Sequence, residues 1–153
     1  MNLTIRNAIR DDVPAIVRLL ADDMLGAQRE LVEEPVAGVY LRAFDELTAQ
    51  PGSELLVAVR DGEVIGCLQL TIIPGLSRRG MRRALLEGVR VGARHRGAKV
   101  GEMLVLEAIA RARAAGCGLV QLTSDASRVD ARRFYERLGF EATHIGMKLS
   151  LPG

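Results

Sequence analysis

The sequence predicts an α/β (α+β) fold in which a mixed, mostly antiparallel central sheet is flanked by helices on both faces. Three observations predict it. A two-residue turn, Asp61-Gly62, joins two strand-like runs into an antiparallel hairpin. The second half of the chain alternates strand, helix, strand and helix, which favours a parallel pairing with helices on the faces of the sheet. The length of 153 residues fits a single domain over residues 1–153.

The N-terminal third predicts a strand followed by two helices. Residues 3–6 alternate apolar and polar side chains, as a strand does. Asp11 is a candidate N-cap of the first helix, and Pro14 suits its first turn. Apolar residues at helical spacing predict its buried face: Val13, Ile16, Val17 and Leu20. Residues 36–47 predict a looser second helix that ends before the turn at residues 50–52.

A meander of three antiparallel strands is predicted next. Asp61-Gly62 separates the strand-like residues 55–59 from residues 64–71, and both turn residues tolerate positive φ. Residues 81–94 alternate in the same way and predict a third, long strand.

The last third predicts a helix, a strand, a helix and a closing strand. Residues 99–114 are rich in strong helix formers, and residues 119–123 form a short apolar run. Ser127 and Asp130 have the spacing of a capping box at the start of the second helix. One face of that helix carries Ala131, Phe134, Tyr135 and Leu138. Residues 140–149 are expected to form the closing strand.

Composition excludes several classes of protein. Hydrophobic residues make up 48% and charged residues 26%, as in ordinary globular proteins. Aromatic residues make up 3%, too few for a surface that stacks on bases, so nucleic acid is not expected as a partner. The longest uncharged stretch, residues 64–77, is too short and too polar to span a membrane. Residues 1–12 lack the apolar segment of a secretory signal, so we do not expect export by that route. Cys67 and Cys117 lack metal-ligand spacing and predict reduced thiols, so we expect a cytoplasmic protein without a metal.

The charge is uneven along the chain. Residues 78–99 hold eight basic side chains and one acidic one, a local charge of +7 in a chain whose net charge is +2. A local basic patch suits a small polyanion better than a long duplex. It ends in a loop that joins a strand to a helix: Arg96, Gly97, Ala98, Lys99, Val100 and Gly101. Free N–H groups at such a helix start bind anions, although a plain turn has the same pattern.

Two sequence blocks resemble the GNAT acetyltransferase superfamily. The family motif Gln/Arg-x-x-Gly-x-Gly/Ala is similar to residues 96–101, where Arg96 and Gly101 match and Lys99 replaces the middle glycine. The family segment Ala-x-x-Phe-Tyr-x-x-x-Gly-Phe matches residues 131–140 at the expected distance downstream. The resemblance covers essentially the whole chain and is weakest over residues 24–52.

The resemblance implies the GNAT acyl-CoA N-acyltransferase fold with acetyl-CoA as the acyl donor and no metal. Backbone N–H groups of residues 96–101 are then expected to hold the pyrophosphate of coenzyme A. The strand over residues 87–91 is expected to separate from residues 119–123, so that its main chain pairs with pantetheine. The main-chain groups nearest the thioester belong to Val89, Arg90 and Val91.

The resemblance also implies two catalytic residues for amide formation. Glu87 lies where many family members carry a base, directly or through water, and Tyr135 resembles the family's general acid. Each has a structural alternative: Glu87 as a counter-ion of Arg90 or Arg83, and Tyr135 as a core ring.

The acceptor is expected to be a primary amine of a small molecule or peptide, attacked directly in a ternary complex. Residues 22–34 carry a net charge of −4 and commonly line the acceptor side in the family, which favours a cationic amine. Other readings stay open: a non-catalytic domain that binds or senses acyl-CoA, a different acyl-CoA as donor, and nucleic-acid binding through residues 78–99. Homodimers are common for such folds, and the sequence does not decide the oligomeric state.

Overall fold

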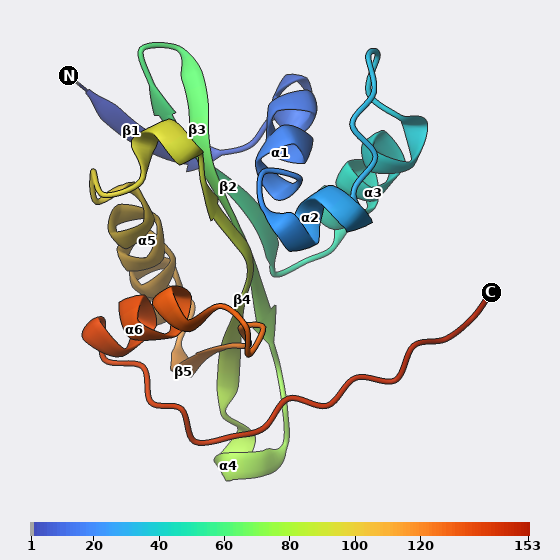
Figure 1. Ribbon diagram of the computed structural model, residues 1–153. Coiled ribbons are helices and arrows are strands. Elements are labelled where there is room, and N and C mark those ends of the chain that lie inside the picture. The colour runs from blue at the N-terminus through green and yellow to red at the C-terminus, as the bar shows by residue number, and fades with distance from the viewer. Residues whose placement is uncertain (1) are drawn as a thin grey trace.

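The computed structural model describes residues 2–153 and contains a five-stranded sheet (Figure 1). The strands, in their order across the sheet, are β1 (Leu3–Asn7), β2 (Ser53–Arg60), β3 (Glu63–Ile73), β4 (Arg82–Val91) and β5 (Cys117–Leu122). Neighbouring strands are antiparallel except β4 and β5, which are parallel. The helices are α1 (Val13–Leu20), α2 (Met24–Arg29), α3 (Gly38–Ala49), α4 (Ser77–Gly80), α5 (Val100–Ala114) and α6 (Val129–Arg137). The predicted mixed, mostly antiparallel sheet is therefore confirmed.

Helices cover both faces of the sheet, as predicted. In Figure 1, α5 and α6 lie on one side of the strands, and α1 and α3 lie on the other. Because side chains alternate along a strand, β2 and β3 supply a core to each face. The α5 face buries Leu56, Ala58, Leu68, Leu70, Leu104, Val105 and Ala108. The α1 face buries Ile16, Leu19, Val57 and Cys67.

The N-terminal helix begins one residue later than predicted. Asp12, and not Asp11, is the N-cap of α1, and its side chain caps nothing in that helix. Its carboxylate instead accepts a hydrogen bond from the Ile9 N–H at 2.8 Å and pairs with Arg6 at 2.7 Å. Val13, Ile16 and Val17 are buried as predicted. Leu20 packs partly buried against the core of the α1 face, and Leu19 is buried as well.

The predicted hairpin is present, with φ of 51° at Asp61 and 77° at Gly62. The strand expected over residues 81–94 ends at Val91. There the Gly92 N–H donates to the Ile65 carbonyl at 2.8 Å, and the chain turns into a short 3-10 helix.

A bulge interrupts β4 before its end. Gln69 pairs with Glu87 and Cys67 pairs with Arg90, so two residues of β4 oppose one residue of β3. Gly88 has φ of 60°, a left-handed conformation that glycine adopts without steric cost. Bulges of this kind bend a strand and increase its local twist.

The predicted capping box at Ser127 is wrong. The Ser127 hydroxyl donates to the Asp125 carboxylate at 2.6 Å, and α6 begins after Arg128 without a side-chain cap. The hydroxyl of Ser127 therefore bonds to Asp125 in the turn before the helix and is not used as a cap. Phe134, Tyr135 and Leu138 face the core as predicted, yet none of the residues of α6 is fully buried.

The predicted closing strand over residues 140–149 is also wrong. Phe140 packs on the core, but residues 141–153 form no strand and are all exposed; we call them the C-terminal arm. The arm has the alternation of a strand, but it pairs with no strand of the described chain (residues 2–153), so β5 stays at the edge of the sheet.

Some features are absent from the described residues. No helix between residues 2 and 153 is long and apolar enough to cross a membrane. Over the same range, no three His, Cys, Asp or Glu side chains gather as they would around a metal ion. Cys67 and Cys117 are both free thiols, and Cys67 is buried.

Candidate functional site

A gap opens between β4 and β5. The two strands pair from Arg82 with Cys117 to Leu86 with Leu122, and beyond Leu86 no residue of β4 pairs with β5. Residues 87–91 therefore have β3 on one side and no strand on the other. This is the separation that the sequence analysis predicted, and it leaves main-chain groups of β4 free toward the gap.

The loop that follows β4 leads into α5 with a left-handed residue. Lys99 is the N-cap of α5, with φ of 64° and ψ of 17°, and its side chain makes no capping bond. Glycine is favoured at such a position, which explains the glycine of the family motif. The N–H groups of Val100, Gly101 and Glu102 have no acceptor among residues 2–153. The positive end of the helix therefore presents free donors beside the gap.

The two glycines of the loop have different surroundings. A Cβ on Gly97 would have no atom within 4 Å, whereas a Cβ on Gly101 would lie 3.4 Å from the ring of Phe134 and 3.5 Å from Val91. The start of α5 at Gly101 therefore packs against the end of β4 and against α6, and a Cβ there would make ordinary van der Waals contacts. The loop is open on its outer side.

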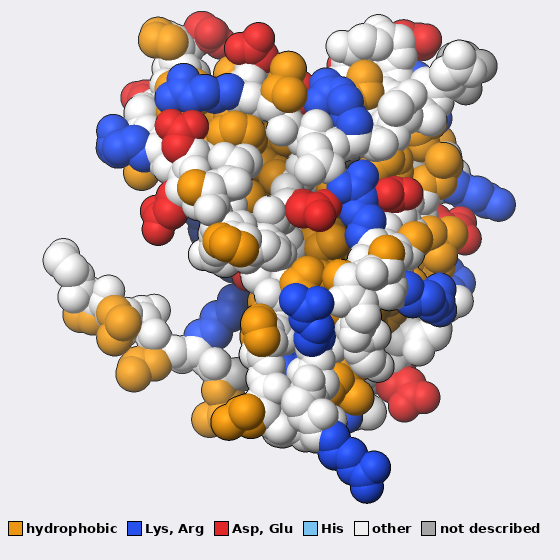
Figure 2. Space-filling view, turned by 180° about the vertical axis from the view of Figure 1, so that it is seen from behind, with side chains coloured by type: hydrophobic (Ala, Val, Ile, Leu, Met, Phe, Trp, Pro, Cys, Tyr) orange, Lys and Arg blue, Asp and Glu red, His pale blue; other side chains and the backbone are white. Residues whose placement is uncertain are grey.

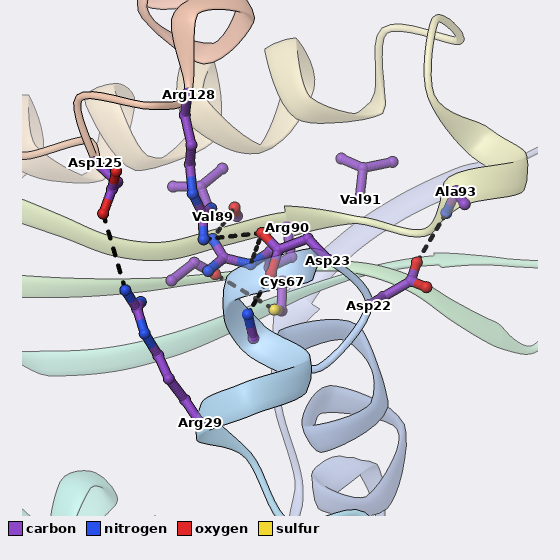
Figure 3. A network of polar contacts seen from close by, with 12 residues as sticks. Asp22, Asp23, Arg29, Cys67, Val89, Arg90, Val91, Ala93, Asp125 and Arg128 are labelled. Atoms are coloured by element: carbon purple, nitrogen blue, oxygen red, sulfur yellow. Dashed lines mark hydrogen bonds and ion pairs between the residues drawn. The ribbon is translucent and has the colours of Figure 1, made fainter.

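Arg96 turns back from the loop toward α1. Its guanidinium donates to the Val91 carbonyl at 3.3 Å and lies 3.8 Å from the carboxylate of Asp22. Asp22 also accepts from the Ala93 N–H at 3.2 Å, as Figure 3 shows. The acid therefore fastens the loop to the segment between α1 and α2.

A second acid joins two arginines across the gap (Figure 3). Asp23 precedes α2 and accepts from the Gly26 N–H at 2.6 Å. Its other oxygen lies 2.8 Å from Arg128 and 4.0 Å from Arg90. Burial favours a raised pKa for Asp23, but the hydrogen bond and the neighbouring arginines outweigh it and lower the pKa. Asp23 is therefore ionised at neutral pH.

Arg90 is the more buried of the two arginines. One of its nitrogens donates to the Val89 carbonyl at 3.0 Å, but its buried Nε has no hydrogen-bond partner among residues 2–153. Burial, and then the charge of Arg128, lower the pKa of Arg90. Two guanidiniums that share the single carboxylate of Asp23 carry a net positive charge, which favours a bound anion.

Tyr135 reaches the same place from α6. Its ring lies edge-on to the rings of Phe134 and Phe140, with centroids 5.1 and 5.7 Å away. Burial raises the pKa of Tyr135, although the charges of Arg90 and Arg128 lower it to a smaller extent. No hydrogen bond links its hydroxyl to residues 2–153. Tyr135 therefore keeps its proton at neutral pH.

Glu87 stands at the start of the gap and is exposed. It makes no ion pair with any residue from 2 to 153. Arg90 faces Asp23, and Arg83 donates to Gln121 at 3.3 Å. The structure therefore does not support Glu87 as a counter-ion of Arg90 or Arg83.

The structure brings most of the predicted site residues to one region. Residues 87–91 line the gap, the loop over residues 96–101 adjoins its end, and Tyr135 lies near Arg90. Sequence reasoning missed Asp23 and Arg128 as partners, because the contact joins residues more than a hundred positions apart. A hollow of about 680 Å³ lies elsewhere, between α1 and residues 62–65 and 92–95. Asp23, Arg90 and Arg128 do not line it.

Cys67 lies beneath the bulge and is not a nucleophile. Its thiol lies 3.5 Å from the Gly88 carbonyl, and burial raises its pKa to about 12. A thiol with this pKa is not ionised at neutral pH.

Comparison with known proteins agrees with this geometry. The sequence model of the acetyltransferase (GNAT) family matches residues 14–140. A glucosamine 6-phosphate N-acetyltransferase of Trypanosoma brucei brucei is 29% identical over 92% of this chain and 99% of its own length. An aminoalkylphosphonate N-acetyltransferase of Salmonella typhimurium is 35% identical over 92% of this chain and 86% of its own length.

A solved structure is similar over nearly the whole chain. The crystal structure of a Bacillus halodurans C-125 protein, described as a transcriptional regulator, is 46% identical and superposes with a TM-score of 0.95. The match covers 98% of this chain and 100% of that one, so it includes most of the C-terminal arm.

Proposed function

The chain belongs to the acetyltransferase (GNAT) family, and we propose that it transfers the acetyl group of acetyl-CoA to a primary amine that also carries a phosphate or phosphonate. Acetyl transfer to an amine follows from the family. The acceptor class is carried by one observation: Arg90 and Arg128 both approach Asp23 in the gap, and the buried Nε of Arg90, 4.0 Å from the Asp23 carboxylate, makes no hydrogen bond.

The donor side of the proposal uses the loop and β4. The unpartnered N–H groups at the start of α5 and the open surface at Gly97 fit a pyrophosphate, which binds well at a helix N-terminus. The Val89 and Val91 carbonyls accept from Arg90 and Arg96. The main-chain N–H groups of β4 beyond Leu86, which have no partner in β5, are therefore the groups that would pair with a pantetheine amide in the gap. Acetyl-CoA supplies the activated acyl group, and the chain's own residues orient it.

The two proton transfers are assigned to Glu87 and Tyr135. Glu87 is exposed and free of ion pairs among residues 2–153, so its carboxylate is available to accept the proton of the attacking amine, directly or through water. Tyr135 holds its proton because its pKa is raised, so it donates a hydrogen bond and then a proton to the departing thiolate. Both groups border the same gap.

The charged side chains at the proposed acceptor site favour an amine that also carries an anionic group. The acidic segment 22–34 had instead suggested a purely cationic amine. Asp22 and Asp23 are already occupied by Arg96, Arg90 and Arg128. A guanidinium has five donors in a fork that matches phosphate, so the two arginines offer more donors than Asp23 uses. The two relatives named above act, by their names, on amines with a phosphate or a phosphonate.

Matched acceptors test the proposal. We expect acetyl-CoA-dependent release of the free thiol with glucosamine 6-phosphate or 2-aminoethylphosphonate, and at least about tenfold lower kcat/KM with glucosamine or ethylamine. Arg128→Gln should raise the KM for the phosphorylated acceptor and leave the KM for acetyl-CoA unchanged. Arg132→Gln, a change at an exposed arginine in the first turn of the helix that Arg128 precedes, is the matched control. Equal rates with the charged and uncharged acceptor of each pair would reject the anionic acceptor.

A second reading is favoured by the description of the Bacillus halodurans relative as a transcriptional regulator. It is a domain that binds acyl-CoA as a signal. Tight acetyl-CoA binding without thiol release for any amine of the panel would support that reading and reject the proposed transfer.

A further inference from the structure

The gap beside β4 has an open end and a closed end. At the open end the start of α5 presents free N–H groups, and at the closed end β4 and β5 begin to pair at Leu86 and Leu122. A coenzyme A whose pyrophosphate binds at α5 extends its pantetheine along β4 toward the closed end, because β4 is free of β5 between these two points. Its acyl group then lies beside Glu87 and Gly88.

Gly88 leaves a small space at this closed end. A Cβ on Gly88 would lie 3.6 Å from the Cδ2 atom of Leu20, which is an ordinary van der Waals contact. Apart from the two chain neighbours of Gly88, no other atom of residues 2–153 would lie within 4 Å of that Cβ. The space that the missing side chain leaves therefore has one wall in this direction, and that wall is the side chain of Leu20.

Leu20 is held in place by the core of the α1 face. It is the last residue of α1 and is half-buried. It packs against a buried cluster of four side chains: Ile16, Leu19, Val57 and Cys67. The Cys67 thiol also lies 3.5 Å from the Gly88 carbonyl, so the same cluster supports the bulge of β4. Because protein interiors are close-packed, Leu20 cannot move away from Gly88 without disturbing this cluster.

The C-terminal arm takes no part in this wall. Residues 141–153 are all exposed, and Figures 1 and 2 show the arm leaving the body of the molecule. Within the described chain, Leu20 is therefore the side chain that limits the space over Gly88.

We propose that Leu20 sets the length of the acyl group that the enzyme accepts. The methyl group of an acetyl group has the size of the side chain that Gly88 lacks, whereas each further carbon of a longer acyl group would meet Leu20. One methylene group in an apolar pocket changes selectivity by about 10–200-fold. The proposal rests on the donor side of the proposed function and uses neither the acceptor nor the two proton transfers.

Calorimetric titration without an acceptor tests the wall, because the binding of an acyl-CoA needs no turnover. The natural protein should bind acetyl-CoA at least about tenfold more tightly than propionyl-CoA or butyryl-CoA. Leu20→Ala removes the wall and should reduce that preference about tenfold or more, while the affinity for free coenzyme A stays the same. Leu55→Ala is the matched control, since Leu55 packs partly buried on the same cluster but does not lie near Gly88.

Filling the space from the other side gives an independent readout. Gly88→Ala places a methyl group where the acyl group is expected, at a residue whose φ is 60°. It should weaken the binding of acetyl-CoA about tenfold more than the binding of free coenzyme A, which serves as the reference for any effect of backbone strain. An equal effect on both ligands would contradict the placement of the acyl group beside Gly88.

The outcomes separate this proposal from the donor site itself. Equal affinities of the natural protein for the three acyl-CoAs would overturn the proposal and leave the donor site intact. An unchanged preference in Leu20→Ala, or the same loss of preference in Leu55→Ala, would have the same meaning. Failure of the natural protein to bind coenzyme A in any form would reject the donor site, and this proposal with it.

Discussion

Replacing Lys99 by glycine or by alanine separates backbone strain from charge at the start of α5. Lys99 has φ of 64°, where a side chain costs about 1–2 kcal/mol relative to glycine. The greater freedom of glycine in the unfolded chain offsets about 0.4–1 kcal/mol of this. Lys99→Gly should therefore be about 1 kcal/mol more stable than Lys99→Ala, which corresponds to a difference in Tm of about 2–4 °C for a domain of this size.

The two variants lose the same positive charge, so their acetyl-CoA affinities give a second readout. If Lys99 contacts a phosphate, both variants should bind acetyl-CoA a few-fold more weakly than the natural protein, with a flatter dependence on salt. Thermal unfolding without ligand measures the first effect, and calorimetric titration at two salt concentrations measures the second. Equal stability of the two variants would show that residue 99 is not left-handed in solution.

Four further changes test other parts of the site and fold. Glu87→Gln should lower the rate by about 10²–10⁴ and remove the acidic limb of the pH profile of kcat/KM; retention of that limb would reject Glu87 as the base. Tyr135→Phe should lower kcat and leave the affinity for acetyl-CoA unchanged. Because the hydroxyl has no partner among residues 2–153, the free energy of unfolding should change by less than about 1 kcal/mol. Unaltered turnover would show that the ring serves only in packing. Gly101→Asp puts a carboxylate at the helix start and a Cβ 3.4 Å from Phe134, so acetyl-CoA binding should be lost by calorimetry while circular dichroism shows a folded chain. Asp12→Asn should cost about 1–2 kcal/mol at pH 7 by urea unfolding, since the pairing is charged but Arg6 is partly exposed.

The ionisation of Asp12 also predicts in which direction the stability of the protein changes with pH. Burial favours a raised pKa for Asp12, but Arg6 and the Ile9 N–H outweigh it and lower the pKa. A carboxyl with a lowered pKa in the folded state stabilises the protein above pH ~4, and this contribution is lost as the pH falls below that value. The stability difference between Asp12→Asn and the natural protein should therefore shrink between pH 5 and pH 2. A constant difference would contradict the assignment.

Local patterns were enough to predict most of the sheet and helices. The Asp61-Gly62 turn and the alternation on either side of it predicted β2 and β3, each about two residues shorter at one end and one residue shorter at the other than in the structure. Helical periodicity predicted α1, the content of strong helix formers predicted α5, and the loop between β4 and α5 followed from its glycines. These signals are short-range, so one sequence is enough to read them.

Tertiary contacts decided what the sequence did not predict. The Asp23–Arg128 pair joins distant segments, and no local pattern reveals which acid meets which arginine. The bulge at Gly88 depends on the register between β3 and β4. The closing strand failed for a similar reason: residues 145–151 have the alternation of a strand, but a strand also needs a neighbour, which the described chain does not supply.

Hydrogen exchange with and without acetyl-CoA tests the central claim, that the gap beside β4 and the start of α5 bind the acyl donor. The account predicts that acetyl-CoA slows amide exchange in residues 87–91 and 97–102, while α3 on the opposite face of the sheet is unaffected. Protection confined to other segments, such as the hollow beside α1, would contradict the account, as would binding that leaves these two segments unprotected.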